Sequence, residues 1–283
     1  MRVGLVGYGL AGRVFHAPLF KFANMELVGI VTNNADRIAQ AKTDFPNAKI
    51  CKNVEELIEV GLDLVVVASI NTEHVPNAKK AITAKIPVVI DKPVAITATE
   101  TAELYDLAEK NDVQLHAFFN RLWDSDTLTI KKQIGLIGKP HRFDGRFERF
   151  RPELNRGSWR EEASPAQGGG LLLDLETHLV STAIYCFGNA KLKYAKLQNI
   201  RGGLAEDDVL LVLEHDSGVI SSLSVSAVAG SPGPRARLLG SNGALVINEL
   251  DPQEPLLRNG NYLEGNRRSK VELHQGEKIT EIK

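Results

Sequence analysis

The chain is poor in cysteine and has no excess of charge of either sign. Its 283 residues include only Cys51 and Cys186, too few and too far apart to predict a disulfide framework. The formal net charge is −1, so no global basic field favours nucleic acid or an anionic membrane surface. We therefore expect neither nucleic acid nor a membrane as a partner.

Long apolar runs, repeats and low-complexity tracts are also missing. No apolar run approaches the length needed to span a bilayer. The seven histidines are scattered, so we expect no metal. A strand pattern starts directly after Met1-Arg2, which leaves no room for a signal peptide. Together with 43% hydrophobic and 24% charged residues, this predicts a cytoplasmic, globular protein.

The first part of the chain alternates strand and helix patterns. Predicted strands cover residues 3–6, 27–31, 62–68, 87–90 and 113–117, and predicted helices cover 13–23, 35–44, 72–84 and 97–111. Asn34 is placed to cap one helix, and Thr97 with Glu100 has the spacing of a capping box. Right-handed crossovers would wind these units into a doubly wound parallel sheet, an α/β fold.

The pattern changes after Asn120. Helices are predicted over 124–134 and 171–187, and strands over 142–150, 208–215, 219–228, 235–239 and 244–248. The turn Ser241-Asn242-Gly243 suits a tight hairpin. We therefore predict one domain over residues 1–119, followed by an α+β domain over 120–283 with an antiparallel sheet and covering helices.

The run Gly7-Tyr8-Gly9-Leu10-Ala11-Gly12 forms a G-x-G-x-x-G turn between a strand and a helix. In a dinucleotide-binding turn the first glycine permits a tight bend and the second lets the backbone approach the pyrophosphate. The third permits close helix packing, and the helix N-terminus faces the negative charge. The motif alone is weak, but this strand–turn–helix context predicts a nicotinamide dinucleotide cofactor.

The end of the second strand indicates which cofactor is bound. NAD-binding folds place Asp or Glu there, which repels a 2′-phosphate. Here the strand ends in Thr32-Asn33-Asn34, with Asp36 further on, and Arg37 is placed to reach a phosphate. These residues favour NADP, with NAD still possible. As an alternative, Arg37 is only a solvated helix residue.

Two places carry candidate catalytic groups. Lys92 lies at the carboxyl end of a predicted strand, where Pro93 restrains its backbone, and a partly desolvated lysine polarises a substrate oxygen. Asp174 and His178 are four residues apart on a predicted helix, and Gly168-Gly169-Gly170 precedes them. Such a pair can hold a hydroxyl and remove its proton. The alternatives are a surface lysine and an ordinary packing pair. Helical spacing would splay Glu176 away, which disfavours a metal site.

A third cluster mixes arginines, tryptophans and polar groups. Its members are Asn120, Arg121, Trp123, Asp124, Arg149, Arg151, Trp159 and Arg160. Several arginines beside tryptophans suit a hydroxylated or anionic small molecule. Salt bridges at an interface are an equal alternative.

Taken together, these motifs resemble the glucose–fructose oxidoreductase / inositol dehydrogenase / MocA family of NAD(P)-dependent dehydrogenases. The anchors are the glycine turn, Val14-Phe15-His16-Ala17-Pro18, Asp91-Lys92-Pro93 and the glycine run with Asp174 and His178. The resemblance covers Met1 to about Arg258. The segments Asn120-Arg121-Leu122-Trp123-Asp124 and Arg149-Phe150-Arg151-Pro152-Glu153 are similar to the branch of NADP-dependent scyllo-inositol dehydrogenases.

The resemblance implies a Rossmann domain, a second domain with a large open antiparallel sheet, and a catalytic set of Lys92, Asp174 and His178. In it His178 takes the hydroxyl proton, Lys92 hydrogen-bonds the same oxygen, and Asp174 orients substrate or histidine. Further cofactor contacts are implied at Ser69, Asn71, His74 and Asp91, and substrate contacts at Asn120, Arg121, Trp123, Arg151, Trp159 and Arg160. A homodimer or homotetramer through the second-domain sheet is also implied.

The chain departs from the family pattern at several positions. Asp91 stands where the family usually has Glu, Ser69-Ile70-Asn71 follows the third predicted strand in place of Pro, and Ser181 replaces Asp. Glu176 replaces a Gly between the catalytic Asp and His. The family's long C-terminal helix is expected to be missing, because the chain ends at Lys283 after a charged stretch from Asn266.

Two functions remain open from the sequence. The first is an NADP-dependent oxidoreductase that moves hydride between nicotinamide and a carbon of a sugar, inositol or related polyol. The second is a non-catalytic NAD(P)-binding sensor of the same fold, which Glu176 and the short C-terminus motivate.

Overall fold

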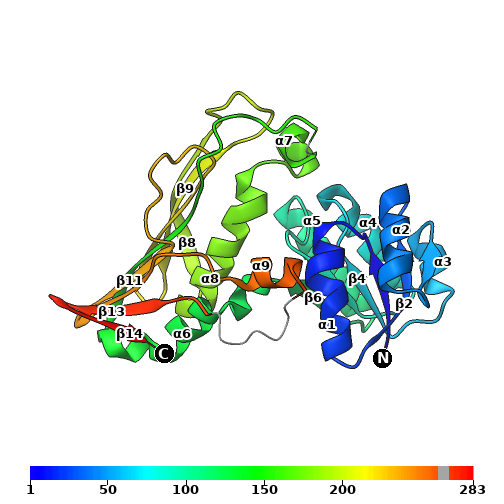
Figure 1. Cartoon of the computed structure of the whole chain (residues 1–283), viewed down its shortest axis with the longest axis horizontal. Helices are drawn as coiled ribbons and strands as arrows, with labels where there is room; N and C mark the ends of the chain where they lie inside the picture. The colour runs from blue at the N-terminus through cyan, green and yellow to red at the C-terminus, as the bar shows by residue number, and fades with distance from the viewer. Residues whose placement is uncertain (158, 261–267, 283) are drawn as a thin grey trace. The chain divides into compact units, whose positions relative to one another are not determined.

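The chain divides into two units, Met1–Phe118 (unit 1) and Phe119–Lys283 (unit 2), shown in Figure 1. The structure is a computed structural model that describes residues 1–157, 159–260 and 268–282, except for the side chains of Trp159 and Arg160. Within these residues no helix combines the length and the apolar character needed to cross a membrane.

Unit 1 is built on a six-stranded sheet in the order β3-β2-β1-β4-β5-β6. Its strands are β1 (Arg2–Val6), β2 (Glu26–Val31), β3 (Lys49–Cys51), β4 (Leu64–Val67), β5 (Val88–Asp91) and β6 (Leu115–Phe118). All neighbours pair in parallel, and this strand order is that of a dinucleotide-binding Rossmann fold. The predicted doubly wound sheet is confirmed. β3 was not predicted, because three residues are too few to show a period.

Helices cover both faces of this sheet. They are η1 (Ala11–His16), α1 (Ala17–Phe22), α2 (Ala35–Asp44), α3 (Val54–Ile58), α4 (Asn71–Thr83) and α5 (Ala98–Lys110). Two buried apolar clusters fill unit 1. Both predicted caps are confirmed: Asn34 Oδ1 accepts from Arg37 N at 3.1 Å, and Thr97 with Glu100 forms a capping box.

Unit 2 contains an eight-stranded sheet within its described residues, in the order β14-β13-β12-β11-β7-β10-β9-β8. Its strands are β7 (Pro140–Glu148), β8 (Ala190–Gln198), β9 (Asp208–His215), β10 (Ile220–Ser226), β11 (Ala236–Gly240), β12 (Gly243–Ile247), β13 (Val271–Gln275) and β14 (Lys278–Ile282). Neighbours are antiparallel except β7 and β10, which pair in parallel. The predicted second domain with a large antiparallel sheet is confirmed.

One face of this sheet packs against helices. The helical segments of unit 2 are η2 (Asn120–Trp123), α6 (Ser125–Gln133), η3 (Ile134–Ile137), α7 (Trp159–Glu162), η4 (Pro165–Gln167), η5 (Leu172–Glu176), α8 (Thr177–Phe187) and α9 (Gln253–Arg258). In Figure 1, α6 and α8 lie along one face, and the opposite face carries no described helix. Phe143, Leu179, Leu223 and Leu238 belong to the core between them.

The charged stretch near the C-terminus contains two strands that were not predicted. β13 and β14 pair around Gly276, which has φ +63°. Val271 and Leu273 are buried while their neighbours are more exposed, so only one face of β13 reaches the core. The charges on the other face concealed this alternation in the sequence.

Candidate active site

The glycine turn of unit 1 presents backbone rather than side chains. Gly7 has φ +97°, and a Cβ at Gly12 would collide with the Gly7 carbonyl oxygen, so neither position accepts a larger residue. A Cβ at Gly9 would instead meet the guanidinium carbon of Arg37 at 3.6 Å. The turn thus leaves its backbone uncovered by side chains close to the Arg37 guanidinium. This arrangement fits a dinucleotide phosphate.

The side chain of Tyr8 belongs to the core beside this turn. It is 1% exposed, and its hydroxyl donates to Asp44 Oδ2 at 2.8 Å. Arg13 Nε donates to the same oxygen at 2.8 Å. Burial and the Asp44 carboxylate raise the pKa of Tyr8. Tyr8 therefore has only its backbone available for a ligand.

The residues that directly follow the end of β2 include no carboxylate. Thr32 is buried, while Asn33 and Arg37 are exposed. Asn34 uses its side-chain oxygen to cap α2, and Asp36 lies in the first turn of that helix. A neutral amide and a guanidinium thus occupy the place where NAD-binding folds put an acid.

His74 connects the ends of β4 and β5. Its Nδ1 lies 2.7 Å from the Pro93 carbonyl oxygen, and its Nε2 lies 3.1 Å from that of Ser69. The ring is 1% exposed, and burial lowers its pKa. Both ring nitrogens face backbone oxygens, so this predicted cofactor residue connects the segment after β4, which carries Ser69, with the turn after β5, which carries Lys92.

Asp91 and Lys92 end β5 beside His16. Asp91 Oδ1 accepts from the Lys92 backbone N–H at 2.8 Å, and His16 Nε2 lies 3.8 Å from Asp91 Oδ2. Burial opposes ionisation of Asp91, but His16, Lys92 and His74 outweigh it and hold its pKa below the usual range. The His16 ring also packs on Phe118, at 4.3 Å between centroids. The carboxylate therefore fixes the backbone that presents Lys92.

In unit 2, Asp174 and His178 lie on one continuous helical segment, but its geometry differs from the expected one. Residues Leu172–Glu176 form a π-helical turn, and the α-helix starts only at Thr177. The four-residue spacing therefore does not mean a simple shared α-helical face. π-turns of this kind occur frequently at functional sites. His178 is 7% exposed, and its ring lies 6.5 Å from that of Phe147.

Close packing requires glycine in the run that precedes this segment. Gly170 has φ +95°, and a Cβ there would collide with the carboxylate of Glu206. The same carboxylate accepts from the backbone N–H of Leu172 at 3.0 Å. A Cβ at Gly169 would collide with the Ala163 carbonyl. The glycines thus allow the close approach that holds the start of the π-turn.

Glu176 points into the core of unit 2. It is 0% exposed, and neither carboxylate oxygen has a hydrogen-bond partner among the described residues. Burial raises its pKa to about 8, and the charge of Arg235 opposes this rise. The π-helical turn that carries Asp174 therefore also carries a buried carboxyl group that retains its proton near neutral pH.

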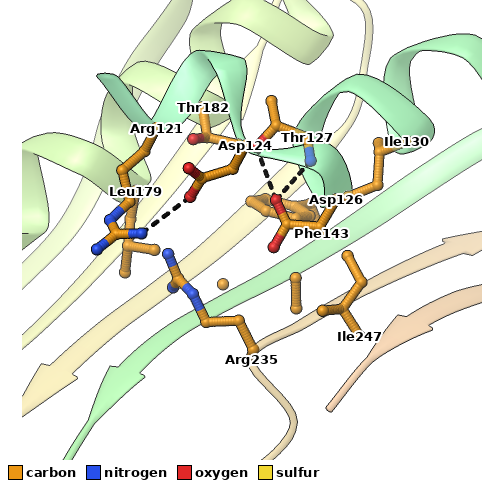
Figure 2. Close-up of a pocket in the computed structure, with 12 residues that line it drawn as sticks. Arg121, Asp124, Asp126, Thr127, Ile130, Phe143, Leu179, Thr182, Arg235 and Ile247 are labelled. Atoms are coloured by element: carbon orange, nitrogen blue, oxygen red, sulfur yellow. Dashed lines mark hydrogen bonds and ion pairs between the residues drawn. The ribbon is translucent and has the colours of Figure 1, made fainter. Parts of the chain in front are cut away.

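Arg121 belongs to a buried ion-pair network, part of which is drawn in Figure 2. Its guanidinium contacts Asp124 Oδ2 at 3.0 Å, as the figure shows, and Glu254 Oε2 at 3.2 Å. Burial raises the pKa of Asp124 to about 7 despite Arg121. Figure 2 shows Arg235 pointing toward this pair across a small cavity that Asp126 and Thr127 also line. Arg121 therefore forms salt bridges within unit 2, whereas the alternative stated from the sequence placed salt bridges at an interface.

The other predicted substrate residues are less enclosed. Trp123 is 70% exposed, and Asn120 Nδ2 donates to Gln253 Oε1 at 3.3 Å. Arg151 is exposed, with its carbonyl oxygen accepting from Arg201. Trp159 and Arg160 start α7, and their side chains lie outside the described residues.

Sequence reasoning missed Phe147 and Arg235. Three guanidiniums surround the Phe147 ring, at centroid distances of 4.5 Å for Arg235, 4.9 Å for Arg149 and 5.4 Å for Arg121. Phe147 is an apolar residue in a strand pattern and gave no signal. Arg235 follows a loop and is nearly 90 residues from Phe147 along the chain. Only the pairing of β11 with β7 brings them together.

Comparison with known families assigns both units. Residues 1–119 match the model of the oxidoreductase family with an NAD-binding Rossmann fold, and residues 129–246 match the GFO/IDH/MocA C-terminal domain. The chain belongs to the GFO/IDH/MocA oxidoreductase family. The predicted family is therefore confirmed, and so is the enzyme class, an NAD(P)-dependent dehydrogenase acting on CH–OH groups.

Members of the GFO/IDH/MocA family resemble the chain over most of its length. The oxidoreductase YdgJ of Escherichia coli is 34% identical, covering 93% of this chain and 75% of its own. The scyllo-inositol 2-dehydrogenase (NADP(+)) IolW of Bacillus subtilis is 31% identical, covering 92% and 72%. The solved structure of yvaA from Bacillus subtilis has a TM-score of 0.87 and 29% identity, covering 99% and 82%.

Proposed function

We propose that this chain is an NADP-dependent dehydrogenase that transfers hydride between nicotinamide and a hydroxyl or carbonyl carbon of a sugar, inositol or related polyol. Residues 1–119 would bind the cofactor, and residues 120–283 would bind the substrate. The resemblance to IolW, an NADP(+)-dependent scyllo-inositol dehydrogenase, supports both parts of this proposal.

The observation that carries the cofactor assignment is the guanidinium of Arg37 next to Gly9. A substituent at Gly9 would lie 3.6 Å from it, and Asn33 is exposed at the end of the neighbouring strand. A guanidinium binds a phosphate through charge-assisted hydrogen bonds, and a neutral strand end does not repel one. The remaining proposed cofactor contacts come from the glycine turn and from the ends of β2, β4 and β5.

The proposed chemistry uses Lys92, Asp174 and His178. Bound nicotinamide supplies the hydride acceptor or donor. His178 takes the proton of the substrate hydroxyl, because a neutral imidazole is a suitable base near neutral pH. Lys92 donates a hydrogen bond to the same oxygen, and Asp174 orients the substrate or the imidazole.

Substrate recognition is proposed for Asn120, Trp123 and Arg151, together with Trp159 and Arg160. Arg121 takes a supporting part in this proposal, because Asp124 and Glu254 already hold its guanidinium. The resulting site would bind hydroxyl groups of a small molecule, with no nucleic acid or membrane involved.

We also propose a cytoplasmic homodimer or homotetramer that assembles through the sheet face opposite α6 and α8. Tyr194 and Ile279 support this interface. Tyr194 is 51% exposed and pairs with Val212, while Ile279 is 58% exposed and pairs with His274. Light scattering on the purified chain measures the oligomeric state.

A fluorescence titration with NADPH and with NADH, followed by turnover on a polyol and sugar panel, tests the proposal. NADPH should bind more tightly than NADH, and Lys92→Met should lose 10²- to 10⁴-fold in turnover, roughly the contribution of one acid–base group, while still binding NADPH. Lys79→Met, a change at a half-exposed lysine paired with Glu103, is the matched control. Tight cofactor binding with no turnover would favour the sensor, and full activity of Lys92→Met would contradict the mechanism.

A further inference from the structure

Phe147 organises a group of charged side chains close to His178. The guanidiniums of Arg149, Arg121 and Arg235 lie within 5.4 Å of its ring centroid, and the His178 ring lies 6.5 Å from it. Phe147 is 4% exposed, so these cations pack on a fixed surface. Cation–π contacts stabilise each guanidinium without neutralising its charge.

Two of the three arginines use their guanidiniums in ion pairs or hydrogen bonds with other residues of unit 2. Arg121 forms ion pairs with Asp124 and Glu254. Arg235 donates to the Arg146 carbonyl oxygen. Their hydrogen bonds hold them in the wall of the cavity of Figure 2.

Arg149 differs from both. Its backbone N–H donates to the Ser226 carbonyl oxygen at 2.8 Å, which fixes its position after β7. In the part of the chain that the structure describes, no carboxylate forms a salt bridge with its guanidinium. The residue is only partly buried, so part of its surface is accessible to a ligand.

The negative charges near Arg149 do not fully compensate the positive charge of its guanidinium. Burial lowers its pKa, the neighbouring charges of Arg151 and Arg121 act in the same direction, and Glu254 and Asp174 oppose them. The Glu254 carboxylate is already shared between Arg121 and Arg258, at 3.2 and 2.8 Å.

Burial reduces the negative charge that two acids of unit 2 supply near neutral pH. The pKa values of Asp124 and Glu176 are raised to about 7 and about 8, mainly because both carboxyl groups are buried. A protonated Glu176 carries no charge, so it does not neutralise the neighbouring arginines at neutral pH.

We infer that Arg149 binds an anionic group of the substrate, a carboxylate or a phosphate ester, while His178 acts on a hydroxyl of the same molecule. This inference rests on the proposed function and narrows its substrate class to acidic sugars or polyols. The guanidinium provides parallel N–H donors that match two oxygens of either anion. The Arg149 guanidinium and the His178 ring lie 4.9 and 6.5 Å from the Phe147 ring centroid, so at most about 11 Å separates the two groups that the substrate would bridge.

Matched pairs of neutral and anionic substrates test this inference. The pairs are D-glucose with D-glucuronate, for a carboxylate, and D-glucose with D-glucose 6-phosphate, for a phosphate. Turnover is measured with NADP+, and binding by thermal shift in the presence of NADPH, for the wild type and for Arg149→Met, Arg149→Lys and Arg142→Met. Arg142 lies in the same strand region and pairs with Asp144 at 2.9 Å, which makes it the matched control.

The wild type should prefer the anionic member of at least one pair, and the preferred pair identifies the anion. Arg149→Met should lower kcat/KM for that member by about 10- to 100-fold, as loss of a hydrogen bond to a charged group does. Arg149→Lys should restore part of the loss, and Arg142→Met should match the wild type.

Two results would overturn the inference while leaving the proposed function intact. One is a preference for the neutral member in both pairs, in turnover and in thermal shift. The other is an equal effect of Arg149→Met on neutral and anionic members. A chain that binds NADPH and gives either of these results refutes only the anion site, whereas a chain that binds no NADPH refutes the proposed function itself.

Discussion

The candidate sites of the two units differ in the groups that form them, mainly backbone in unit 1 and side chains in unit 2. In unit 1 the site is mostly backbone: Gly7 and Gly12 exclude side chains, and Gly9 leaves room beside Arg37. In unit 2 it consists of ionisable side chains: three arginines surround Phe147, and Glu176 is buried in the core. A backbone site depends on local conformation, whereas a charged side-chain cluster depends on burial and on segments far apart in the sequence.

The largest effect on cofactor binding is expected where backbone geometry is essential. Gly12→Val places a side chain against the Gly7 carbonyl, so it should abolish saturable NADPH binding and lower the free energy of unfolding by about 3 kcal/mol. Fluorescence titration and urea unfolding measure the two effects. Gly135→Ala, where a Cβ would meet nothing within 4 Å, should change neither. Normal NADPH binding by Gly12→Val would mean that the turn is not the cofactor site.

Glu176 tests the role of buried charge in unit 2. In the unfolded chain its carboxyl ionises near pH 4.5, whereas the folded protein retains the proton to about pH 8. The folded state therefore binds more protons in this window, and stability falls as pH rises through it. Between pH 5 and pH 8 the ionisation of Glu176 should lower the free energy of unfolding by on the order of 3–5 kcal/mol. A variant without this carboxyl group should not show that loss.

Urea unfolding of Glu176→Gln at both pH values measures this contribution. The wild type should lose more stability than the variant between pH 5 and pH 8. Glu109→Gln, at an exposed glutamate, should behave like the wild type. If Glu176→Gln and the wild type showed the same pH dependence, Glu176 would not be a protonated core residue.

A smaller effect is expected from a single charge at the edge of unit 1. Asn33→Asp puts a carboxylate where a 2′-phosphate would lie, so NADPH affinity should fall about tenfold, equivalent to roughly 1.4 kcal/mol. NADH affinity should hold or improve. Asn47→Asp adds the same charge before β3, at the opposite edge of the parallel sheet, and should leave the preference unchanged. An unaltered preference in Asn33→Asp would contradict the NADP assignment.

The smallest effect is expected at a helix cap outside both sites. Thr97→Ala removes the side chain that accepts from Glu100 N at 3.1 Å, so it should cost about 1 kcal/mol of unfolding free energy. Thr43→Ala, whose hydroxyl only donates to the Ala39 carbonyl within its helix, should cost less. NADPH affinity should not change in either variant. A measurable loss of affinity in Thr97→Ala would show that the cofactor site depends on distant helix stability.

The sequence by itself determined the parts of this protein that depend on local rules. The glycine turn, the strand and helix alternation of unit 1, the Asn34 and Thr97 caps and the absence of an acid after β2 are all properties of neighbouring residues. The family was predicted from the glycine turn together with other short motifs such as Asp91-Lys92-Pro93, and the family models confirm it.

Only the tertiary structure decided how the charged groups of unit 2 are used. Arg121 pairs with Glu254 across more than a hundred residues, Arg235 reaches Phe147 through the pairing of β11 with β7, and Glu176 enters the core through a π-helical turn. Burial and long-range pairing set the charge state of these side chains. Neither property is encoded in the residues adjacent to them.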